Sequence, residues 1–314
     1  MDSRVRGSDD KVAGMSLLLA LAFAAQTRPA PTPARPPTPS EIVAKAPAEA
    51  WETIKPEDLL VIDFVDGARS VVQLAPAFAP IHVANIRALA GAEYWRGASV
   101  YRVQDNYVAQ WGVNEGGPAV PAAVVKRPPA EYDRPVRGLA IRPLGHSDAY
   151  APRVGHALGW PVAYNPRTGR ANLAHCYGMV GVGRDMAPDT GMGGELYAVI
   201  GHAPRHLDRN IALVGRVVEG IEHLSALPRG TETLGFYKSG TVARSIRTAR
   251  LASALPATER PSFQVMRTGS ASFGAFVTAR ANRKDDFFNV PAGGVDLCNA
   301  PVPVRRTPAP SSSR

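Results

Sequence analysis

The chain has 314 residues, of which 45% are hydrophobic, and it contains 29 glycines and 29 prolines. This composition permits a sizeable core and favours short strands and frequent turns over a helical bundle. The net charge is +9, but the arginines are dispersed and lack the clustered basic surface typical of nucleic-acid binding. We therefore expect no nucleic-acid partner.

The first 25 residues have the features of an export signal. Basic residues precede an apolar stretch at 15–25, and Ala22-Phe23-Ala24 supplies a small-x-small cleavage pattern. The stretch is shorter than the roughly 20 apolar residues that span a bilayer. We expect residues 1–25 to be a signal peptide, with a membrane tether as the alternative. The predicted mature protein is exported to the periplasm and has no stable membrane span.

The rest of the chain divides by composition. Six prolines between residues 27 and 40 predict an extended linker at 26–50. A folded domain is expected at 51–253, and an insertion within it, at 112–170, is predicted to be mainly irregular and exposed. A C-terminal extension at 254–305 is expected to pack on the domain, followed by a disordered tail at 306–314.

Strand and turn signals predict a mainly β domain. Residues 59–64 are rich in β-formers, and Asp66-Gly67 is a hairpin signal before a second strand at 70–74. Pro80 suits the start of an amphipathic helix that ends near Gly91. Further elements are expected at 98–102, 107–111, 177–182, 195–200, 213–214 and 244–252 as strands, and at 217–227 as a second helix.

The extension also has apolar signals. Ser270 is a candidate N-cap for a short helix, and several apolar residues suggest contact with the domain: Phe273, Phe276, Val277, Phe287, Phe288, Val290, Val295 and Leu297. The only two cysteines are Cys176 and Cys298. Two buried free thiols are the preferred interpretation, and a disulfide bond in an oxidising compartment is the alternative.

Seven short motifs follow one another between Leu59 and Ala252. They are Ala79-Pro80 with Asn85-Ile86, Val100-Tyr101-Arg102-Val103, Tyr107-Val108-Ala109-Gln110, Gly178-Met179-Val180-Gly181, Gly193-Gly194-Glu195-Leu196-Tyr197, His206-Leu207-Asp208 and Gly215-Arg216-Val217-Val218-Glu219-Gly220. Together and in this order they resemble the cyclophilin family. The resemblance implies a closed eight-stranded antiparallel barrel with two capping helices.

The resemblance also implies cis/trans isomerisation of the bond before proline. The barrier to rotation is about 18–20 kcal/mol, and stabilising the twisted amide needs no covalent intermediate, metal or cofactor. The prolyl nitrogen of that state can accept a hydrogen bond, and a guanidinium is a permanently charged donor. Arg102 is therefore the expected catalytic residue, acting preferentially on the twisted state.

By the same resemblance, ten further residues are expected to bind proline-containing peptides. The walls of an apolar socket for the proline are expected from Tyr107, Val108, Tyr197 and Leu207. Gln110 is expected to hold either Arg102 or the peptide backbone. Gly183 and Arg184 are expected to bind the peptide backbone, and His206 to lie at the rim of the socket. Ile211 stands where the family commonly has a histidine, and Glu195 where it has a glutamine. The expected partners are such peptides and unfolded exported proteins, and the protein is expected to be a monomer.

Two functional interpretations remain open, a prolyl isomerase and a catalytically weak peptide- or protein-binding module. Glu195 separates them, because a tight pair with Arg102 favours the binding module and a carboxylate turned away favours the enzyme. Two other motifs carry little weight. Asp189-Thr190-Gly191 lacks the second carboxylate of an aspartic protease and predicts a turn. His202 and His206 have a proline between them, so no helical metal site is expected.

Overall fold

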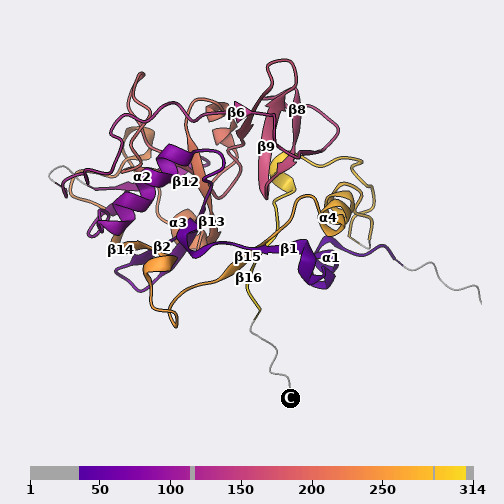
Figure 1. The fold of residues 1–314 in the computed structure, drawn as a ribbon, viewed down its shortest axis with the longest axis horizontal. Coiled ribbons are helices and arrows are strands. Elements are labelled where there is room, and N and C mark those ends of the chain that lie inside the picture. The colour runs from indigo at the N-terminus through magenta and orange to yellow at the C-terminus, as the bar shows by residue number, and fades with distance from the viewer. Residues whose placement is uncertain (1–34, 114–116, 286, 309–314) are drawn as a thin grey trace, which may run out of the picture. The chain divides into compact units, whose positions relative to one another are not determined.

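The computed structural model describes residues 35–113, 117–285 and 287–308 (Figure 1). The predicted signal peptide at 1–25 lies outside the described residues. Within the described part of the chain, no helix has both the length and the apolar character needed to span a bilayer.

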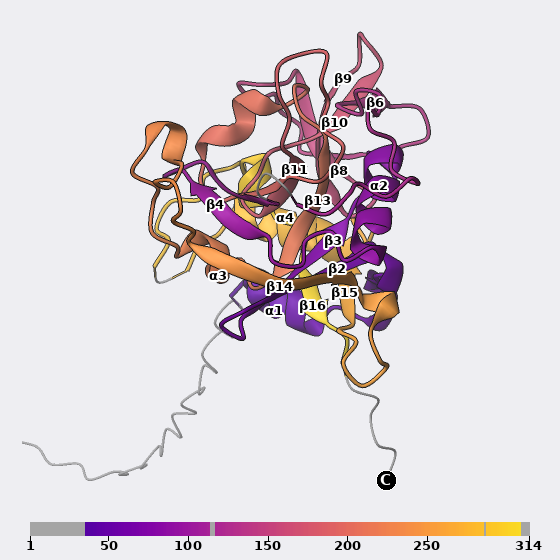
Figure 2. The same cartoon turned by 90° about the vertical axis from the view of Figure 1, so that its left-hand side faces the viewer.

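A closed antiparallel barrel forms the centre of the fold, and the predicted fold class is confirmed (Figures 1 and 2). Its strands follow the order β11-β12-β5-β4-β14-β2-β3-β13 around the barrel. Their bounds are β2 Leu59–Phe64, β3 Arg69–Leu74, β4 Ser99–Val103, β5 Val108–Gly112, β11 Met179–Val182, β12 Leu196–Val199, β13 Leu213–Glu219 and β14 Arg244–Leu251.

The first hairpin of the barrel forms where it was predicted. Strand β2 pairs with β3 in antiparallel register across a turn at Asp66-Gly67. Gly67 has φ +89, a left-handed conformation that glycine adopts without steric cost. The Asp66 carboxylate accepts a hydrogen bond from the Ala68 amide, as is usual for an aspartate in a turn.

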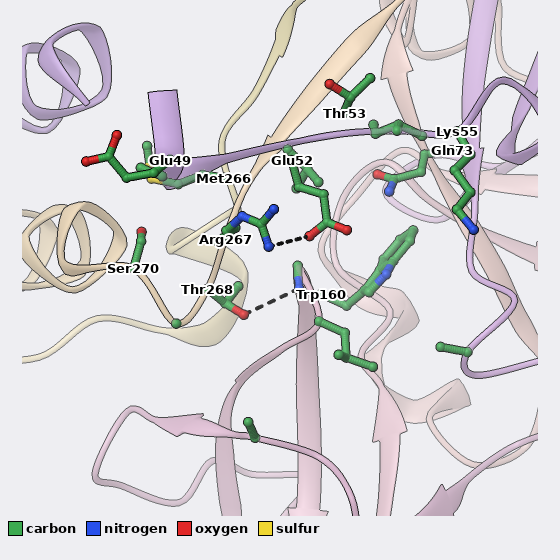
Figure 3. A pocket seen from close by; sticks show the side chains of 18 of the residues that line it. Glu49, Glu52, Thr53, Lys55, Gln73, Trp160, Met266, Arg267, Thr268 and Ser270 are labelled. Atoms are coloured by element: carbon green, nitrogen blue, oxygen red, sulfur yellow. Dashed lines mark hydrogen bonds and ion pairs between the residues drawn. The ribbon is translucent and has the colours of Figure 1, made fainter. Parts of the chain in front are cut away.

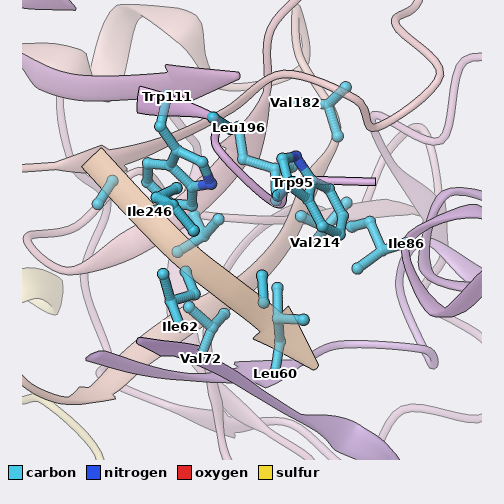
Figure 4. Packing of buried hydrophobic residues seen from close by; sticks show 14 of the residues in the cluster. Leu60, Ile62, Val72, Ile86, Trp95, Trp111, Val182, Leu196, Val214 and Ile246 are labelled. Carbon is cyan, nitrogen blue, oxygen red and sulfur yellow. The ribbon is translucent and has the colours of Figure 1, made fainter. Parts of the chain in front are cut away.

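The barrel interior is a continuous apolar core (Figure 4). Helix α2, Pro80–Gly91, contributes Ile86 and Leu89, and the one-turn helix α3, Glu222–Ser225, contributes Leu224. Trp95 is fully buried after α2, and its indole nitrogen donates to the carbonyl of Gly194 at 2.8 Å. This bond satisfies the polar atom of a large core side chain.

The helix predicted at 217–227 is confirmed for a single turn only, α3 at Glu222–Ser225. Strand β13 extends to Glu219, and within it Val217 pairs with Val72 and Glu219 with Val71. Gly220 then ends the strand with φ +79, at a point where a Cβ would lie 2.2 Å from the Arg69 carbonyl oxygen. The apolar residues of this segment belong partly to the end of a strand and partly to a single helical turn. Their combined spacing resembles that of one longer helix.

The described residues of 112–170 are mainly irregular, as predicted, but the prediction missed the strands that this segment contains. A second, five-stranded antiparallel sheet lies here, with the order β6-β10-β9-β8-β7. Its strands β8 and β9 are buried on both faces for much of their length, so they lack the alternation that reveals a half-exposed strand. The bounds are β6 Arg134–Pro135, β7 Arg142–Pro143, β8 Arg153–Ala157, β9 Trp160–Asn165 and β10 Arg170–Leu173.

Two buried polar side chains of α2 fasten the insertion to the barrel. The Glu131 carboxylate accepts from the amides of Ile81 and His82 at the N-terminus of α2, and contacts the His82 ring Nδ1 at 2.7 Å. An anion at this helix end satisfies free N–H groups and complements the helix dipole. Asn85 exchanges hydrogen bonds with the backbone of Val125.

The C-terminal extension packs on the outer face of the barrel, with two departures from prediction. It contains β15 Phe263–Met266, α4 Ala271–Ala281, and β16 Val304–Arg306, and Ser270 caps α4 as predicted. Strand β15 pairs with β16 and with β1, Trp51–Thr53. Phe287, Phe288 and Val290 are exposed rather than packed. Arg306 belongs to β16, so the tail predicted as disordered at 306–314 begins within a strand.

Two predictions about the chain ends of the domain need correction. Helix α1, Pro39–Lys45, lies within the predicted linker at 26–50, because Thr38 and Glu41 form a capping box that outweighs the local proline content.

Cys176 and Cys298 form a disulfide bond, and their Cα atoms are 5.1 Å apart across a sequence separation of 122 residues. Only the folding back of the extension brings them together, so the spacing in the sequence did not reveal the bond.

A groove of about 760 Å³ lies between β1, the first turn of α4 and the turn before β9 (Figure 3). An ion pair of 3.3 Å joins Glu52 to Arg267 across it. The amide of Gly159 donates to the Thr268 hydroxyl at 3.3 Å. None of the predicted peptide-binding residues lines this groove, so it is separate from the candidate site.

Candidate active site

Ten of the eleven predicted site residues line one cavity of about 740 Å³. They come from the ends of several barrel strands and from the loops that follow them, and they are Arg102, Tyr107, Val108, Gln110, Gly183, Arg184, Glu195, Tyr197, Leu207 and Ile211. His206 does not line the cavity, but its ring stacks on Tyr107 with 5.6 Å between centroids. The sequence thus located the cavity, while the roles of these residues remain predictions.

Arg102 lies on β4, directly across from Gln110 on β5. Its guanidinium donates from Nη1 to Gln110 Oε1 at 3.0 Å, from Nη2 to Gln104 Oε1 at 2.6 Å, and from Nε to the Leu234 carbonyl at 2.8 Å. A guanidinium has five N–H donors. Three are used in these bonds, and the other two have no partner among the described residues.

No carboxylate neutralises Arg102 in the described part of the chain, where its acceptors are two amides and one backbone carbonyl. Its Cζ atom lies 5.8 Å from the ring centroid of Tyr107 and 5.4 Å from that of Phe236. Burial lowers the pKa of Arg102, yet a guanidinium remains charged at neutral pH. The site therefore presents a fixed positive charge that is only partly compensated.

Glu195 is turned toward two neutral partners instead of Arg102. Its Oε2 accepts from the Tyr101 hydroxyl at 2.7 Å and from Gln110 Nε2 at 3.1 Å. Gln110 Nε2 also donates to the Tyr101 hydroxyl at 2.6 Å. Burial and the nearby Glu195 carboxylate raise the pKa of Tyr101, which keeps its hydroxyl protonated as a donor. Glu195 thus acts on Arg102 only through Gln110.

The predicted proline socket is assembled from three elements. Tyr107 and Val108 come from the start of β5, Tyr197 from β12, and Leu207 from the short helix η3, Ala203–Leu207, with Ile211 after it. Burial raises the pKa of Tyr107, so this phenol is neutral at physiological pH. The socket combines apolar walls with two phenol rings.

Tyr197 is held from beneath by a buried polar chain. Its hydroxyl lies 2.9 Å from His175 Nε2, and His175 Nδ1 lies 2.8 Å from Asp208 Oδ1. Because a carboxylate only accepts, His175 Nδ1 donates to Asp208 and, in the neutral ring, Nε2 accepts from the tyrosine. Gly181 leaves room for Tyr197, since a Cβ there would lie 2.3 Å from the tyrosine Cζ.

Sequence reasoning missed part of the cavity wall. The additional lining residues are Tyr94, Tyr101, Val113, Lys126, Asp185, Asp189, Gly191, Met192, Gly194, Leu234 and Phe236. Tyr101 was within reach of prediction, because it neighbours Arg102 in the same motif. Leu234 and Phe236 were not, because they lie more than a hundred residues from Arg102 in a segment with no recognisable motif. Among the described residues, no cluster of three or more metal-ligand side chains occurs.

Comparison with protein families decides the assignment. The family model for cyclophilin type peptidyl-prolyl cis-trans isomerases matches residues 62–249, more than half of the chain. The chain belongs to the cyclophilin family. The match begins in β2 and ends in β14, so it covers the barrel and the whole cavity wall described above. Membership assigns peptidyl-prolyl cis-trans isomerase activity to this cyclophilin, in agreement with the resemblance seen in its motifs.

The fold is also similar to that of a solved structure. The crystal structure of cyclophilin AquaCyp293 from Hirschia baltica is similar over 85% of this chain and 96% of its own, with a TM-score of 0.64 and 22% identity. A cyclophilin type peptidyl-prolyl cis-trans isomerase from Cryptosporidium parvum aligns with 62% of this chain and 98% of its own, with a TM-score of 0.38 and 11% identity. No curated protein sequence matches this cyclophilin.

Proposed function

We propose that the cavity around Arg102 binds X-Pro segments and that Arg102 is the catalytic residue of isomerisation. The observation that carries the proposal is the state of its guanidinium. Three N–H groups are fixed by neutral acceptors and two remain without a partner in the described residues. A donor held in this way needs little reorganisation when the amide twists, which is the condition for preferential stabilisation of a transition state.

In the proposed mechanism, the residues around Arg102 have two separate roles, binding of the proline ring and positioning of the guanidinium. The substrate proline enters the socket of Tyr107, Val108, Tyr197 and Leu207, which fixes the ring while the preceding residue rotates. Gln110 holds the plane of the guanidinium from the facing strand. The twisted prolyl nitrogen then accepts from one of the remaining N–H groups. No proton leaves the enzyme in this scheme, because the guanidinium acts as a donor and not as an acid.

The geometry of Glu195 favours the enzyme over the weak binding module. A restrained arginine requires an ion pair across the cavity, and none joins Glu195 to Arg102 among the described residues. The carboxylate is instead engaged by a phenol and an amide. Gly183 and Arg184, beyond the end of β11, are proposed to contact the peptide backbone at the cavity rim.

The test is prolyl isomerisation of a proline peptide by the wild type, Arg102→Ala and Arg102→Lys. We expect Arg102→Ala to lower kcat by about 100-fold or more, the usual effect of removing one transition-state donor. Arg102→Lys should recover little activity, since an ammonium keeps the charge but not the planar donor array. If Arg102→Ala, with an unchanged thermal unfolding midpoint, isomerises the peptide as fast as the wild type, the role of Arg102 is refuted.

We further propose that the clients are exported proteins. The predicted signal at 1–25 supports this, as does the Cys176–Cys298 disulfide bond, a type of bond that persists in oxidising compartments and is rare in the cytosol. Cell fractionation combined with thiol labelling tests both points. We expect a processed periplasmic protein without free thiols. An unprocessed cytoplasmic protein with both thiols free contradicts the proposal.

A further inference from the structure

The segment at 229–243, which we call the strap, runs from α3 to β14 and lies along β4 (Figure 2). It is joined to β4 by backbone hydrogen bonds at both ends and by a bridge between Phe236 and Arg102. The bonds run from Gly230 to Val103 at 2.9 Å, from Tyr237 to Tyr101 at 3.2 Å and from Ala243 to Val100 at 3.0 Å. The strap is thus an ordered wall of the cavity.

The backbone of the strap is shaped to reach Arg102. Leu234 has φ 58 and Gly235 has φ 79, and a left-handed conformation is costly for leucine. This turn directs the Leu234 carbonyl to Arg102 Nε at 2.8 Å. A Cβ on Gly235 would lie 2.6 Å from the Cα of Gln104, whose side chain accepts from Arg102 Nη2. The strap therefore provides one acceptor of Arg102, the Leu234 carbonyl, and packs directly against Gln104, which provides another.

The side chains of the strap present an apolar surface to the cavity. Phe236 is 38% exposed and Leu234 is 60% exposed, and both line the cavity. The Phe236 ring stacks on Tyr101 with 6.0 Å between centroids and an interplanar angle of 19°. It also lies 5.4 Å from the Arg102 guanidinium carbon. Exposed aromatic surface held rigidly inside a binding cavity is typical of a contact site for another apolar group.

This surface is separate from the proline socket. The socket is built from β5, β12 and η3, whereas Phe236 and Leu234 belong to the strap, and the two walls meet at Arg102. A peptide whose proline fills the socket and whose amide lies at Arg102 must place a residue next to that proline near the guanidinium. The strap is the apolar wall available there.

We propose that the strap is a specificity element, in which Phe236 and Leu234 receive a large apolar side chain adjacent to the substrate proline, while the Leu234 carbonyl positions Arg102. The inference rests on the proposed catalytic role of Arg102. It assigns a substrate class to the site: segments in which a phenylalanine- or leucine-like residue neighbours the proline.

The selectivity test uses peptides with a single proline, in which the residue before or after it is either alanine or phenylalanine. We expect the wild type to prefer phenylalanine at one of the two positions by roughly three- to tenfold in kcat/KM, as for an aromatic pair. Phe236→Ala should bring that ratio close to one, mainly through KM, and Phe236→Leu should keep part of it. Val242→Ala, an exposed apolar residue of the strap that does not line the cavity, should retain the wild-type ratio.

Either of two results overturns the specificity role. One is a wild-type enzyme without preference at either position. The other is Phe236→Ala losing activity equally on all peptides, which would leave Phe236 as a support of Arg102 alone. Failure of the catalytic proposal can be distinguished from failure of the specificity role. The catalytic proposal is tested by the kcat of Arg102→Ala, whereas the role of the strap is tested by the ratio of kcat/KM between peptides.

The positioning role has its own matched pair of variants. Gly235 and Gly240 share φ +79, but a Cβ meets Gln104 only at Gly235 and meets nothing within 4 Å at Gly240. Both alanine variants therefore carry similar backbone strain, and only Gly235→Ala displaces the contacts of Arg102. We expect Gly235→Ala to lower kcat at least fivefold more than Gly240→Ala, with KM little changed, when both are assayed at a temperature where circular dichroism shows them folded. Equal kcat values in the two variants would overturn the positioning role.

Discussion

Two arginines of this cyclophilin occupy similar chemical surroundings in different parts of the barrel. Arg102 on β4 lies across from Gln110, and Arg216 on β13 lies across from Gln73. Each donates to the glutamine and to a backbone carbonyl, and each lies over an aromatic ring. Neither is paired with a carboxylate in the described residues. What differs is access, since Arg102 opens on a cavity and Arg216 is 8% exposed.

The difference separates the proposed catalytic cation from a structural one. Arg216 donates twice to Gln73 Oε1, at 3.0 and 2.8 Å, and once to the Gly159 carbonyl at 2.9 Å, with its guanidinium carbon 4.4 Å from the Trp160 centroid. It therefore ties the barrel to the turn between β8 and β9. Burial lowers the pKa of Arg216 to about 9. Arg102 is only partly shielded from solvent, whereas Arg216 is almost completely shielded. Neutral acceptors hold both cations, and solvent access decides which can act on a ligand.

The largest effect on stability should come from Arg216→Met. The change leaves the oxygens of Gln73 and Gly159 buried without their donor, and each such group costs about 1–3 kcal/mol. We expect the free energy of unfolding to fall by roughly 2–4 kcal/mol, with kcat/KM within about twofold of the wild type where the variant is folded. Urea unfolding and the isomerisation assay measure the two quantities. A variant as stable as the wild type, or one inactive while folded, would break the contrast between the two arginines.

A buried histidine near Arg216 should make stability depend on pH. His156 on β8 is fully buried, and its Nε2 lies 2.9 Å from the Ala300 carbonyl. Burial, with smaller contributions from Arg142 and Arg216, lowers the pKa of His156 from 6.5 to about 4. The unfolded chain therefore binds the proton first, and the contribution of His156 is complete above pH 6.5 and is lost as the pH falls toward 4.

Between pH 7 and pH 5 this loss should be about 2 kcal/mol. His156→Gln keeps a donor for Ala300 but does not titrate, so its free energy of unfolding should fall by that much less over the same interval. Urea unfolding of both proteins at the two pH values gives the comparison. If the stability of the wild type and of His156→Gln changed equally with pH, burial would not lower the pKa of His156, and the prediction would be wrong.

The barrel was predictable because its strands obey local rules. Residues 59–64 and 244–251 alternate or cluster apolar side chains, and Asp66-Gly67 imposes a turn whatever surrounds it. The helix at Pro80 was predictable for the same reason. The sheet at 134–173 was not, because its two longest strands, β8 and β9, are buried for much of their length and lack the alternation of a half-exposed strand. That burial is a tertiary property, and no period in the sequence records it.

The candidate site divides in the same way. The motifs around Arg102, Gln110 and Tyr197 located the cavity, because each motif lies on a barrel strand and contributes residues to the cavity wall. The strap and the partner of Glu195 were missed, since both depend on long-range contacts. The sequence left open whether Glu195 pairs with Arg102 or turns away, and the phenol of Tyr101, 94 residues away, accounts for its actual orientation. The sequence placed a carboxylate in the cavity, but only the fold shows which donor holds it.

The smallest effect is expected from Glu195→Gln, the change that most directly tests how isolated Arg102 is. The amide oxygen of glutamine can still accept from Tyr101, and Gln110 keeps its bond to Arg102. We therefore expect kcat/KM within about threefold of the wild type, since the lost charge is exposed and its interactions are screened by solvent. A tenfold or greater rise in kcat would mean that the carboxylate restrains Arg102 through Gln110. The two arginines would then differ in their charge balance as well as in solvent access.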